Sequence, residues 1–418
     1  IKAIETVDGD GKYTKNVHLF EGNHIFKANP IVIEKLKEQK KLLFNGVLVH
    51  SYPHSWRSKA PLVHRATPQW FISMESHGLR KKALKALDDT KFYPDKGRER
   101  IKAMIETRPD WCVSRQRVWG VPLPIFVHKT TKEILVDDNV NENIASIYEK
   151  EGSDCWFSDN PQRFLGDKYK AEDYEKISDI VEVWFDSGCT HAFVLEKRED
   201  LQWPASMYLE GSDQHRGWFH SSLLESCGTR GRAPYESILS HGFVVDGKGL
   251  KMSKSVGNVI APEDILKKYG ADILRIWVAS SNYAEDLRID YSILEQHADS
   301  YRKIRNTFRY LLGNLNDDFQ KIDMENLDIK QLTELERFML HRVYELNKNF
   351  KNYFKSYDFH NLYKELLNFC TVDLSAFYFD IRKDALYCDS KNSDRRKSSI
   401  IVLNIILESL VKWFAPIL

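Results

Sequence analysis

Several features that mark other classes of protein are missing from this sequence. The six cysteines are scattered and form no Cys-x-x-Cys pair, which argues against a disulfide framework or a zinc knuckle and favours a reducing, cytoplasmic environment. No uninterrupted apolar run is long enough to span a bilayer, and no signal peptide opens the chain. Lysine and arginine (61) nearly balance aspartate and glutamate (60), so any nucleic-acid site must be a local basic patch.

Glycine and proline almost vanish from about residue 296 onward, where a 3.6-residue apolar period predicts a helical bundle. From 110 to about 290, short β-like runs alternate with helical patterns, which predicts a parallel sheet flanked by helices. A chain of 418 residues, 42% of them apolar, should form two or more compact units. No helical zipper and no large apolar face is suggested, so we expect a monomer that makes no membrane contact.

A lysine-containing run after a short apolar stretch is the most informative part of the chain. Gly247 and Gly249 are expected to allow a tight turn, because glycine reaches backbone angles closed to other residues. Lys251 and Lys254 follow, with Ser253 between them. A mobile, cationic loop suits an anionic leaving group such as pyrophosphate, whose charge must be held during reaction and released afterwards. An ordinary basic hairpin is the alternative.

A second candidate site lies where a short strand is expected to end at Glu210. Gly211 would then make the turn, and Ser212 or Asp213 would cap a helix through a side-chain oxygen. Ligands of open α/β sheets gather at the carboxyl end of a strand and the start of its helix. The two carboxylates there suit the recognition of hydroxyl or ammonium groups.

Three more residues could form a pocket for a small apolar ligand. Gln214 and Trp218 lie four apart, hence on one face of the expected helix, and would offer an amide and an apolar wall. A capped helix with a buried tryptophan is the alternative. Trp184 is expected near the end of a strand over residues 180–185, where a core tryptophan explains it equally well.

Four motifs occur in an order that resembles bacterial-type isoleucyl-tRNA synthetases, which are class I aminoacyl-tRNA ligases. They are Asp110-Trp-Cys-Val-Ser-Arg-Gln-Arg-Val-Trp-Gly120, Trp184-Phe-Asp-Ser-Gly188, Leu209-Glu-Gly-Ser-Asp-Gln-His-Arg-Gly-Trp218 and Lys251-Met-Ser-Lys-Ser255. The resemblance covers essentially the whole chain. It implies the second half of a class I Rossmann-like catalytic domain over residues 110–298, then a helical domain over residues 299–418 that binds the tRNA stem and anticodon.

The same resemblance implies a two-step reaction. L-isoleucine attacks the α-phosphate of ATP, used with Mg, and the acyl group then moves to the terminal ribose of tRNA(Ile). Lys254, assisted by Lys251 and Ser253, would neutralise charge on the transferring phosphates without a covalent protein intermediate. Together with Lys254, three residues would hold the adenylate: Glu210, Gly211 and Asp213. Three others would form the walls of the isoleucine pocket: Trp184, Gln214 and Trp218.

The sequence also departs from the family pattern. A His-x-Gly-His element and the Thr-rich strand of an editing pocket are absent, so residues 1–60 would be the C-terminal remnant of an inserted editing domain. Residues 61–109 would connect it back to the catalytic core. We therefore expect a piece of a longer enzyme that is inactive alone. The alternatives are a non-catalytic tRNA-binding or regulatory module derived from such a synthetase and, less favoured by the tryptophans, a nucleotidyltransferase.

Two smaller expectations concern metal and tRNA. Residues 52–58 resemble a stretch where some relatives place two zinc-binding cysteines, but Ser55 and Ser58 stand there, so we predict no metal. In the helical part, four cations at spacings of three and four could contact phosphates, with a solvated helix face as the alternative: Arg302, Lys303, Arg305 and Arg309.

Overall fold

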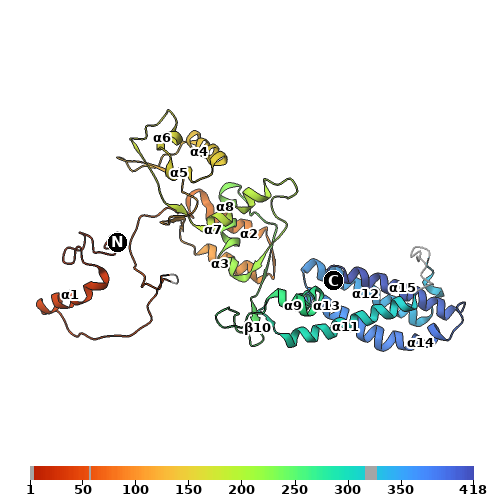
Figure 1. Cartoon of the computed structure of the whole chain (residues 1–418). Helices are drawn as coiled ribbons and strands as arrows, with labels where there is room; N and C mark the ends of the chain where they lie inside the picture. Colours follow the sequence, from red (N-terminus) through yellow and green to blue (C-terminus); the bar gives the residue numbers. More distant parts are fainter. Residues whose placement is uncertain (1–3, 56–57, 316–326) are drawn as a thin grey trace. The chain divides into compact units, whose positions relative to one another are not determined.

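A computed structural model of the chain describes residues 4–55, 58–315 and 327–418 (Figure 1). It divides into two compact units. The first unit consists of Ile1–Ser73 and Asp110–Glu182, and the second unit consists of Met74–Pro109 and Val183–Leu418. The division differs from the expected boundary at residue 110, since the segment that follows it groups with the N-terminal part. None of the described helices combines the length and the apolar character needed to cross a membrane.

The first unit contains short strands and small helices. After α1 (Ile25–Glu38), its strands pair antiparallel: β1 (Phe71–Ile72) with β3 (Trp111–Cys112), β4 (Ser114–Arg115) with β7 (Ile180–Val181), and β5 (Phe126–His128) with β6 (Tyr174–Lys176). The core forms around Trp156, whose ring lies 5.0 Å from Phe126 and 5.1 Å from Phe164. Three helices contribute to it: α4 (Asp138–Glu151), α5 (Cys155–Ser158) and α6 (Pro161–Leu165).

The second unit starts with an α/β part that has a parallel sheet. Three strands lie in the order β2 (Lys91–Tyr93), β9 (Ser237–His241) and β8 (Tyr208–Gly211), all parallel. The sheet was expected from runs within 110–290, but those at 126–128 and 180–181 pair antiparallel in the first unit, and β2 lies before residue 110. Helices α2 (Leu79–Asp88), α3 (Lys96–Glu106), α7 (Val183–Gly188) and α8 (Trp218–Thr229) belong to the same part. Residues 219–227 of α8 are all buried, which explains why this helix has no polar face.

One predicted strand is wrong in its extent. The strand expected over 180–185 ends at Val181, and α7 begins at Val183, so Trp184 lies in a helix. Short apolar runs do not distinguish a strand from a buried helix by periodicity. The strand ends beside Glu182, whose buried carboxylate accepts a hydrogen bond from Trp111 Nε1 at 2.8 Å.

A second strand pair links the α/β part to the helices that follow. Strand β10 (Val244–Asp246) pairs parallel with β11 (Leu287–Ile289), and between them lie α9 (Pro262–Tyr269) and α10 (Ala271–Ser280). This pair is separate from the three-stranded sheet.

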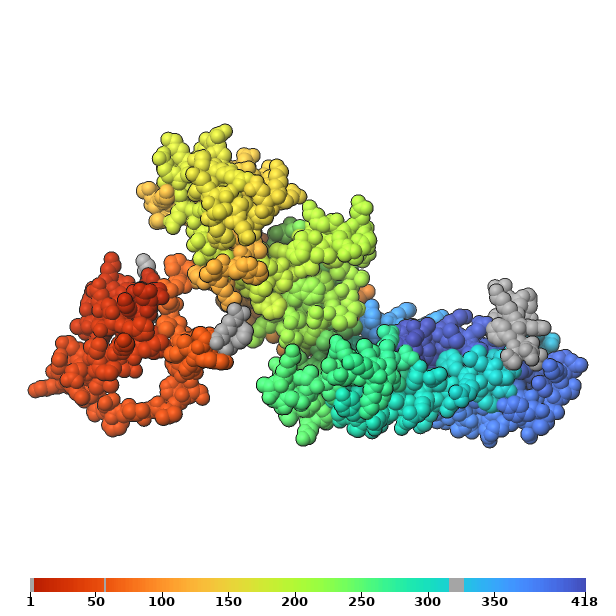
Figure 2. Space-filling model, viewed as in Figure 1, coloured from red at the N-terminus to blue at the C-terminus, as the bar shows by residue number. Residues whose placement is uncertain are grey.

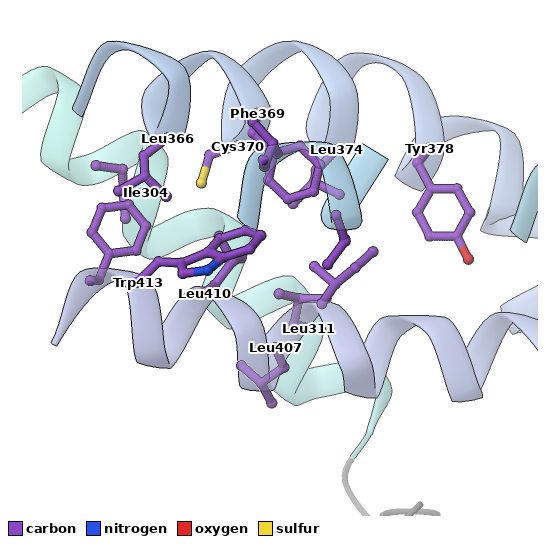
Figure 3. Packing of buried hydrophobic residues seen from close by; sticks show 14 of the residues in the cluster. Ile304, Leu311, Leu366, Phe369, Cys370, Leu374, Tyr378, Leu407, Leu410 and Trp413 are labelled. Atoms are coloured by element: carbon purple, nitrogen blue, oxygen red, sulfur yellow. The ribbon is translucent and has the colours of Figure 1, made fainter. Parts of the chain in front are cut away.

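The rest of the described chain is the predicted helical bundle. It consists of α11 (Tyr291–Asn314), α12 (Glu334–Ser356), α13 (Phe359–Asn368), a π-helical stretch (Phe369–Tyr378), α14 (Phe379–Tyr387) and α15 (Asp394–Phe414). Helix α11 begins before the expected start at 299, because Asp290 caps it. Figure 3 shows part of the bundle core. Side chains of α13 and the π-helical stretch (Leu366, Phe369, Leu374 and Tyr378) face side chains of α15 (Leu407, Leu410 and Trp413) and of α11 (Leu311).

Candidate active site

Two parallel strands end side by side and bring together most of the expected adenylate-binding residues. In the β8–β9 pair, Glu210 lies opposite Ser240 and Gly211 lies opposite His241. A methyl group added at Gly211 would come within 2.6 Å of Asp213 Oδ1 and 3.9 Å of the His241 ring. The carboxylates of Glu210 and Asp213 are both exposed there. This edge can therefore present acceptors to the hydroxyl or ammonium groups of a small ligand.

His241 is a residue of this edge that the sequence analysis did not single out. Its Nδ1 lies 2.7 Å from the Gly242 carbonyl oxygen, to which it can donate a hydrogen bond. The signal was available, because His241 is the last residue of β9, and residues at the carboxyl ends of parallel strands gather at one edge.

The turn after β8 differs from the prediction. Gly211 is the extended last residue of the strand, Ser212–His215 form a 3₁₀ turn, and α8 begins only at Trp218. Neither Ser212 nor Asp213 caps the helix. Gln214 does so instead, since its Oε1 accepts a hydrogen bond from Trp218 N at 3.0 Å while its Nε2 donates to Asp213 Oδ2 at 3.1 Å.

The three expected pocket residues do meet, although not by the predicted geometry. Gln214 and Trp218 are on different helical segments, so they do not share one helix face. They converge with Trp184 at Gly217, where an added methyl group would overlap Gln214 Oε1 and come within 2.9 Å of the Trp184 ring. Only glycine leaves room for this approach. Trp184 is 43% exposed, so part of its ring remains available to a ligand.

Trp218 is held firmly on both its edge and its face. Its Nε1 donates to the Ser187 carbonyl oxygen at 2.9 Å, which joins α8 to α7. One ring face stacks on Tyr208, with centroids 3.9 Å apart and an interplanar angle of 6°. The tryptophan is therefore a fixed wall, in keeping with both the pocket and the buried-core interpretations.

The lysine loop follows β10. A turn closes by a bond from Gly249 N to Asp246 O at 2.9 Å, and Gly249 has the positive φ (+81°) that favours glycine. Gly247 is needed for a different reason from the expected one: a side chain there would overlap the Asp290 carboxylate. Lys251 and Lys254 are both exposed, and neither forms a salt bridge with any described residue. Figure 2 shows the green segment around residue 250 at the surface.

Two histidines near the candidate site in sequence are buried, His215 in the 3₁₀ turn and His220 in α8. His215 and His220 are 1% and 2% exposed. Burial, with the nearby charge of Arg108, lowers the pKa of His220 to about 3, and burial also lowers the pKa of His215. Both are therefore neutral near pH 7.

No metal site is evident among the residues that the structure describes, which contain no group of three or more His, Cys, Asp or Glu able to hold an ion. Of the stretch 52–58, Trp56 and Arg57 lie outside the described residues. Ser58 N donates to Ser55 Oγ at 3.2 Å, so this hydroxyl helps close a turn.

Comparison with known proteins assigns the chain to a family. Residues 9–290 match the family described as tRNA synthetases class I (I, L, M and V), and residues 336–418 match the anticodon-binding domain of tRNA ligase. The first match alone covers more than half of the chain. The chain belongs to the class I tRNA synthetases.

Individual relatives agree with this assignment and with the predicted resemblance. The chain is 97% identical over 418 residues to an isoleucine–tRNA ligase of Pelagibacter ubique (strain HTCC1062), and 50% identical over 422 residues to one of Mesorhizobium japonicum. It covers only 46% and 41% of these relatives, so it spans less than half their length.

The fold is also that of known class I synthetases. Methionyl-tRNA synthetase of Mycobacterium tuberculosis in complex with methionyl-adenylate matches with a TM-score of 0.62 at 15% identity, covering 89% of this chain and 64% of that one. The predicted fold class, an α/β catalytic part followed by helices, is thereby confirmed.

Proposed function

We propose that this chain is part of an isoleucine–tRNA ligase that activates L-isoleucine with ATP and transfers it to tRNA(Ile). The near-identity to the Pelagibacter ligase supports the choice of amino acid and tRNA. Two observations support the chemistry: Glu210 and Asp213 form an acidic edge at the end of β8, and Lys251 and Lys254 are both exposed on the loop that follows β10.

In the activation step an isoleucine carboxylate oxygen attacks the α-phosphorus of ATP, and the bond to the bridging oxygen of pyrophosphate breaks. Negative charge grows on the leaving pyrophosphate. Lys254, with Lys251 and the Ser253 hydroxyl beside it, compensates that charge, as does the Mg that ATP brings with it. Exposed ammonium groups without a protein counter-ion are suited to this task, because no salt bridge must break before they reach the phosphates.

The strand edge would hold the rest of the adenylate. Glu210 and Asp213 accept hydrogen bonds from the ribose hydroxyls and the amino group of isoleucine, and Gly211 lets the ligand approach the backbone. Trp184, Gln214 and Trp218 wall the side-chain pocket. Such an apolar pocket separates isoleucine from valine by only about 1–3 kcal/mol, so an editing step elsewhere in the enzyme is required.

The remaining parts would have supporting roles in a monomeric, cytoplasmic enzyme. Residues 1–60 belong to the editing domain, 61–109 return to the core, 110–298 complete the catalytic domain, and 299–418 bind tRNA(Ile). In the last part the basic stripe on α11 is partly engaged by the protein itself: Arg302 pairs with Asp299, and Arg305 lies 5.7 Å from the Tyr301 ring. Lys303 and Arg309 would then make the phosphate contacts.

The test is isoleucine-dependent exchange of pyrophosphate into ATP. In the full-length protein, Lys254→Ala should slow exchange by about 100- to 1,000-fold while isoleucine binding stays within about 2-fold, because the lysine acts on the transition state rather than on the amino acid. Lys267→Ala, an exposed lysine on the neighbouring helix α9, is the matched control and should behave as wild type. The 418-residue chain alone should not exchange.

Unchanged exchange in the Lys254→Ala enzyme would refute the role of the loop. A full-length protein that binds tRNA but does not activate isoleucine would favour the alternative, a non-catalytic module derived from a synthetase.

A further inference from the structure

Asn258 closes the base of the lysine loop. Its Oδ1 accepts a hydrogen bond from Ser253 N at 2.9 Å. Its Nδ2 donates to Asp246 Oδ2 at 2.9 Å and lies 3.3 Å from the Lys251 carbonyl oxygen. A single amide side chain therefore contacts the loop at its first residue and at two points beside the lysines.

Asp246 organises the other end of the same loop. Its Oδ1 accepts the backbone N–H groups of Lys248 and Leu250 at 3.0 and 2.8 Å, while Oδ2 receives Asn258. These hydrogen bonds keep the pKa of the Asp246 carboxyl below its ordinary value, and the bond from Asn258 contributes most. The carboxylate is thus ionised near pH 7 and uses both oxygens to shape the loop.

The backbone of the loop is held, whereas its functional side chains are not. Met252 lies between Lys251 and Ser253 in the sequence. Its side chain packs against the apolar cluster that includes Ile265 and Leu294. Lys251 and Lys254 project outward without a salt bridge to any described residue. Such a division is expected of a loop whose backbone must be ordered before an anionic ligand arrives.

We propose that Asp246 and Asn258 are positioning residues that pair across the lysine loop and present Lys251 and Lys254 to the triphosphate as one unit. The proposal rests on the proposed function, and neither residue needs to touch the substrate. Displacing a catalytic group by about 1 Å can cost about 100-fold in rate, so loss of the pairing should lower the rate of activation rather than the affinity for isoleucine.

The first experiment measures pyrophosphate exchange by the full-length Asn258→Ala enzyme. We expect kcat to fall about 10- to 100-fold with the KM for isoleucine changed less than about 2-fold. Asn314→Ala is the matched control: its Nδ2 donates to the Tyr310 carbonyl oxygen at 2.9 Å within α11, outside the loop. The control removes the same amide and should leave kcat unchanged.

The second experiment exchanges the two groups. Asn258→Asp alone places two carboxylates where one donor and one acceptor stood, and should be at least as slow as Asn258→Ala. Adding Asp246→Asn restores an amide–carboxylate pair with the acceptors for Ser253, Lys248 and Leu250 retained. The double variant should therefore recover at least about 10-fold of the lost kcat, which a general loss of stability would not allow.

The outcomes separate this proposal from the proposed function. If Lys254→Ala slows exchange but Asn258→Ala does not, or the double variant recovers nothing, the pairing is not what positions the lysines. If Lys254→Ala itself is without effect, the function proposed for the loop fails first.

Discussion

The α/β part and the helical bundle of the second unit are both well buried, but their interiors are built differently. Helix α8 buries His220, Ser222 and Ser226 along with its leucines. The bundle core is a continuous set of leucine, isoleucine and aromatic side chains from all of its helices. The bundle is therefore stabilised mainly by apolar packing, whereas α8 carries a larger share of buried polar side chains, Glu225 among them, within residues 219–227.

The bundle also buries polar side chains. Its described residues include a buried ion pair, and four neutral polar groups are buried as well: Thr307, Ser398, Ser399 and Asn404. Glu336 is fully buried on α12, and its Oε1 lies 2.6 Å from Arg382 Nε and 2.9 Å from Ser399 Oγ. Burial alone would raise the pKa of Glu336, but the bonds from Arg382 and Thr333 more than offset this and leave it below its ordinary value. The pair joins α12 to α14 and α15.

The largest effect is expected from breaking this pair. Glu336→Gln leaves Arg382, only 9% exposed, without a counter-charge and should lower the free energy of unfolding by about 3–5 kcal/mol. Urea unfolding of the whole chain, with hydrogen exchange to localise the change to α12 and α14, measures it. Glu334→Gln, an exposed carboxylate on the same helix, should change stability by less than about 0.5 kcal/mol. Equal effects of the two variants would show that the ion pair does not stabilise the bundle.

The same contrast explains what the sequence could predict. The helical bundle expected from about residue 296 onward was predicted because apolar packing requires a regular 3.6-residue pattern. The parallel strand β8, expected to end at Glu210 and ending at Gly211, was predicted for a similar reason, since short apolar runs between helical patterns indicate such a sheet.

The roles of the site residues stay a prediction, but part of the expected geometry was wrong. A 3₁₀ turn separates β8 from α8, so the capping oxygen comes from Gln214 rather than from Ser212 or Asp213. Asn258 was visible in the sequence, but its bonds to Asp246 and Ser253 depend on how the loop folds back on itself. Side-chain-to-backbone bonds across a loop have no periodic signature, so they could not be predicted from the pattern.

A smaller effect, on pH dependence, should come from the α/β part. The pKa of His220 is about 3 in the folded chain, mainly because burial disfavours the charged form, against an ordinary value near 6.5. As pH falls from 7 to 5, the unfolded state binds a proton that the folded state does not, so stability falls by about 2 kcal/mol. His220→Gln should remove that part of the pH dependence in urea unfolding.

The control for this experiment is His341→Gln, because His341 is exposed on α12 with a side-chain accessibility of 64%. This exposed substitution should change the free energy of unfolding at pH 7 by less than about 0.5 kcal/mol. If His220→Gln has the same slope as wild type between pH 7 and 5, the histidine is not held neutral, and the two interiors differ less than their composition indicates.

The smallest effect is expected where the two parts meet in sequence. Asp290 caps α11, its Oδ1 accepting Ile293 N at 2.8 Å and the Ser292 hydroxyl at 2.7 Å, while its Oδ2 lies against Gly247 before the lysine loop. Asp290→Ala should cost about 1 kcal/mol in urea unfolding, the usual worth of a helix cap. Asp290→Asn retains the acceptor and should cost only a few tenths. If instead both variants lose several kcal/mol, the contact of the carboxylate with the Gly247 turn, and not the cap, is what stabilises the start of the bundle.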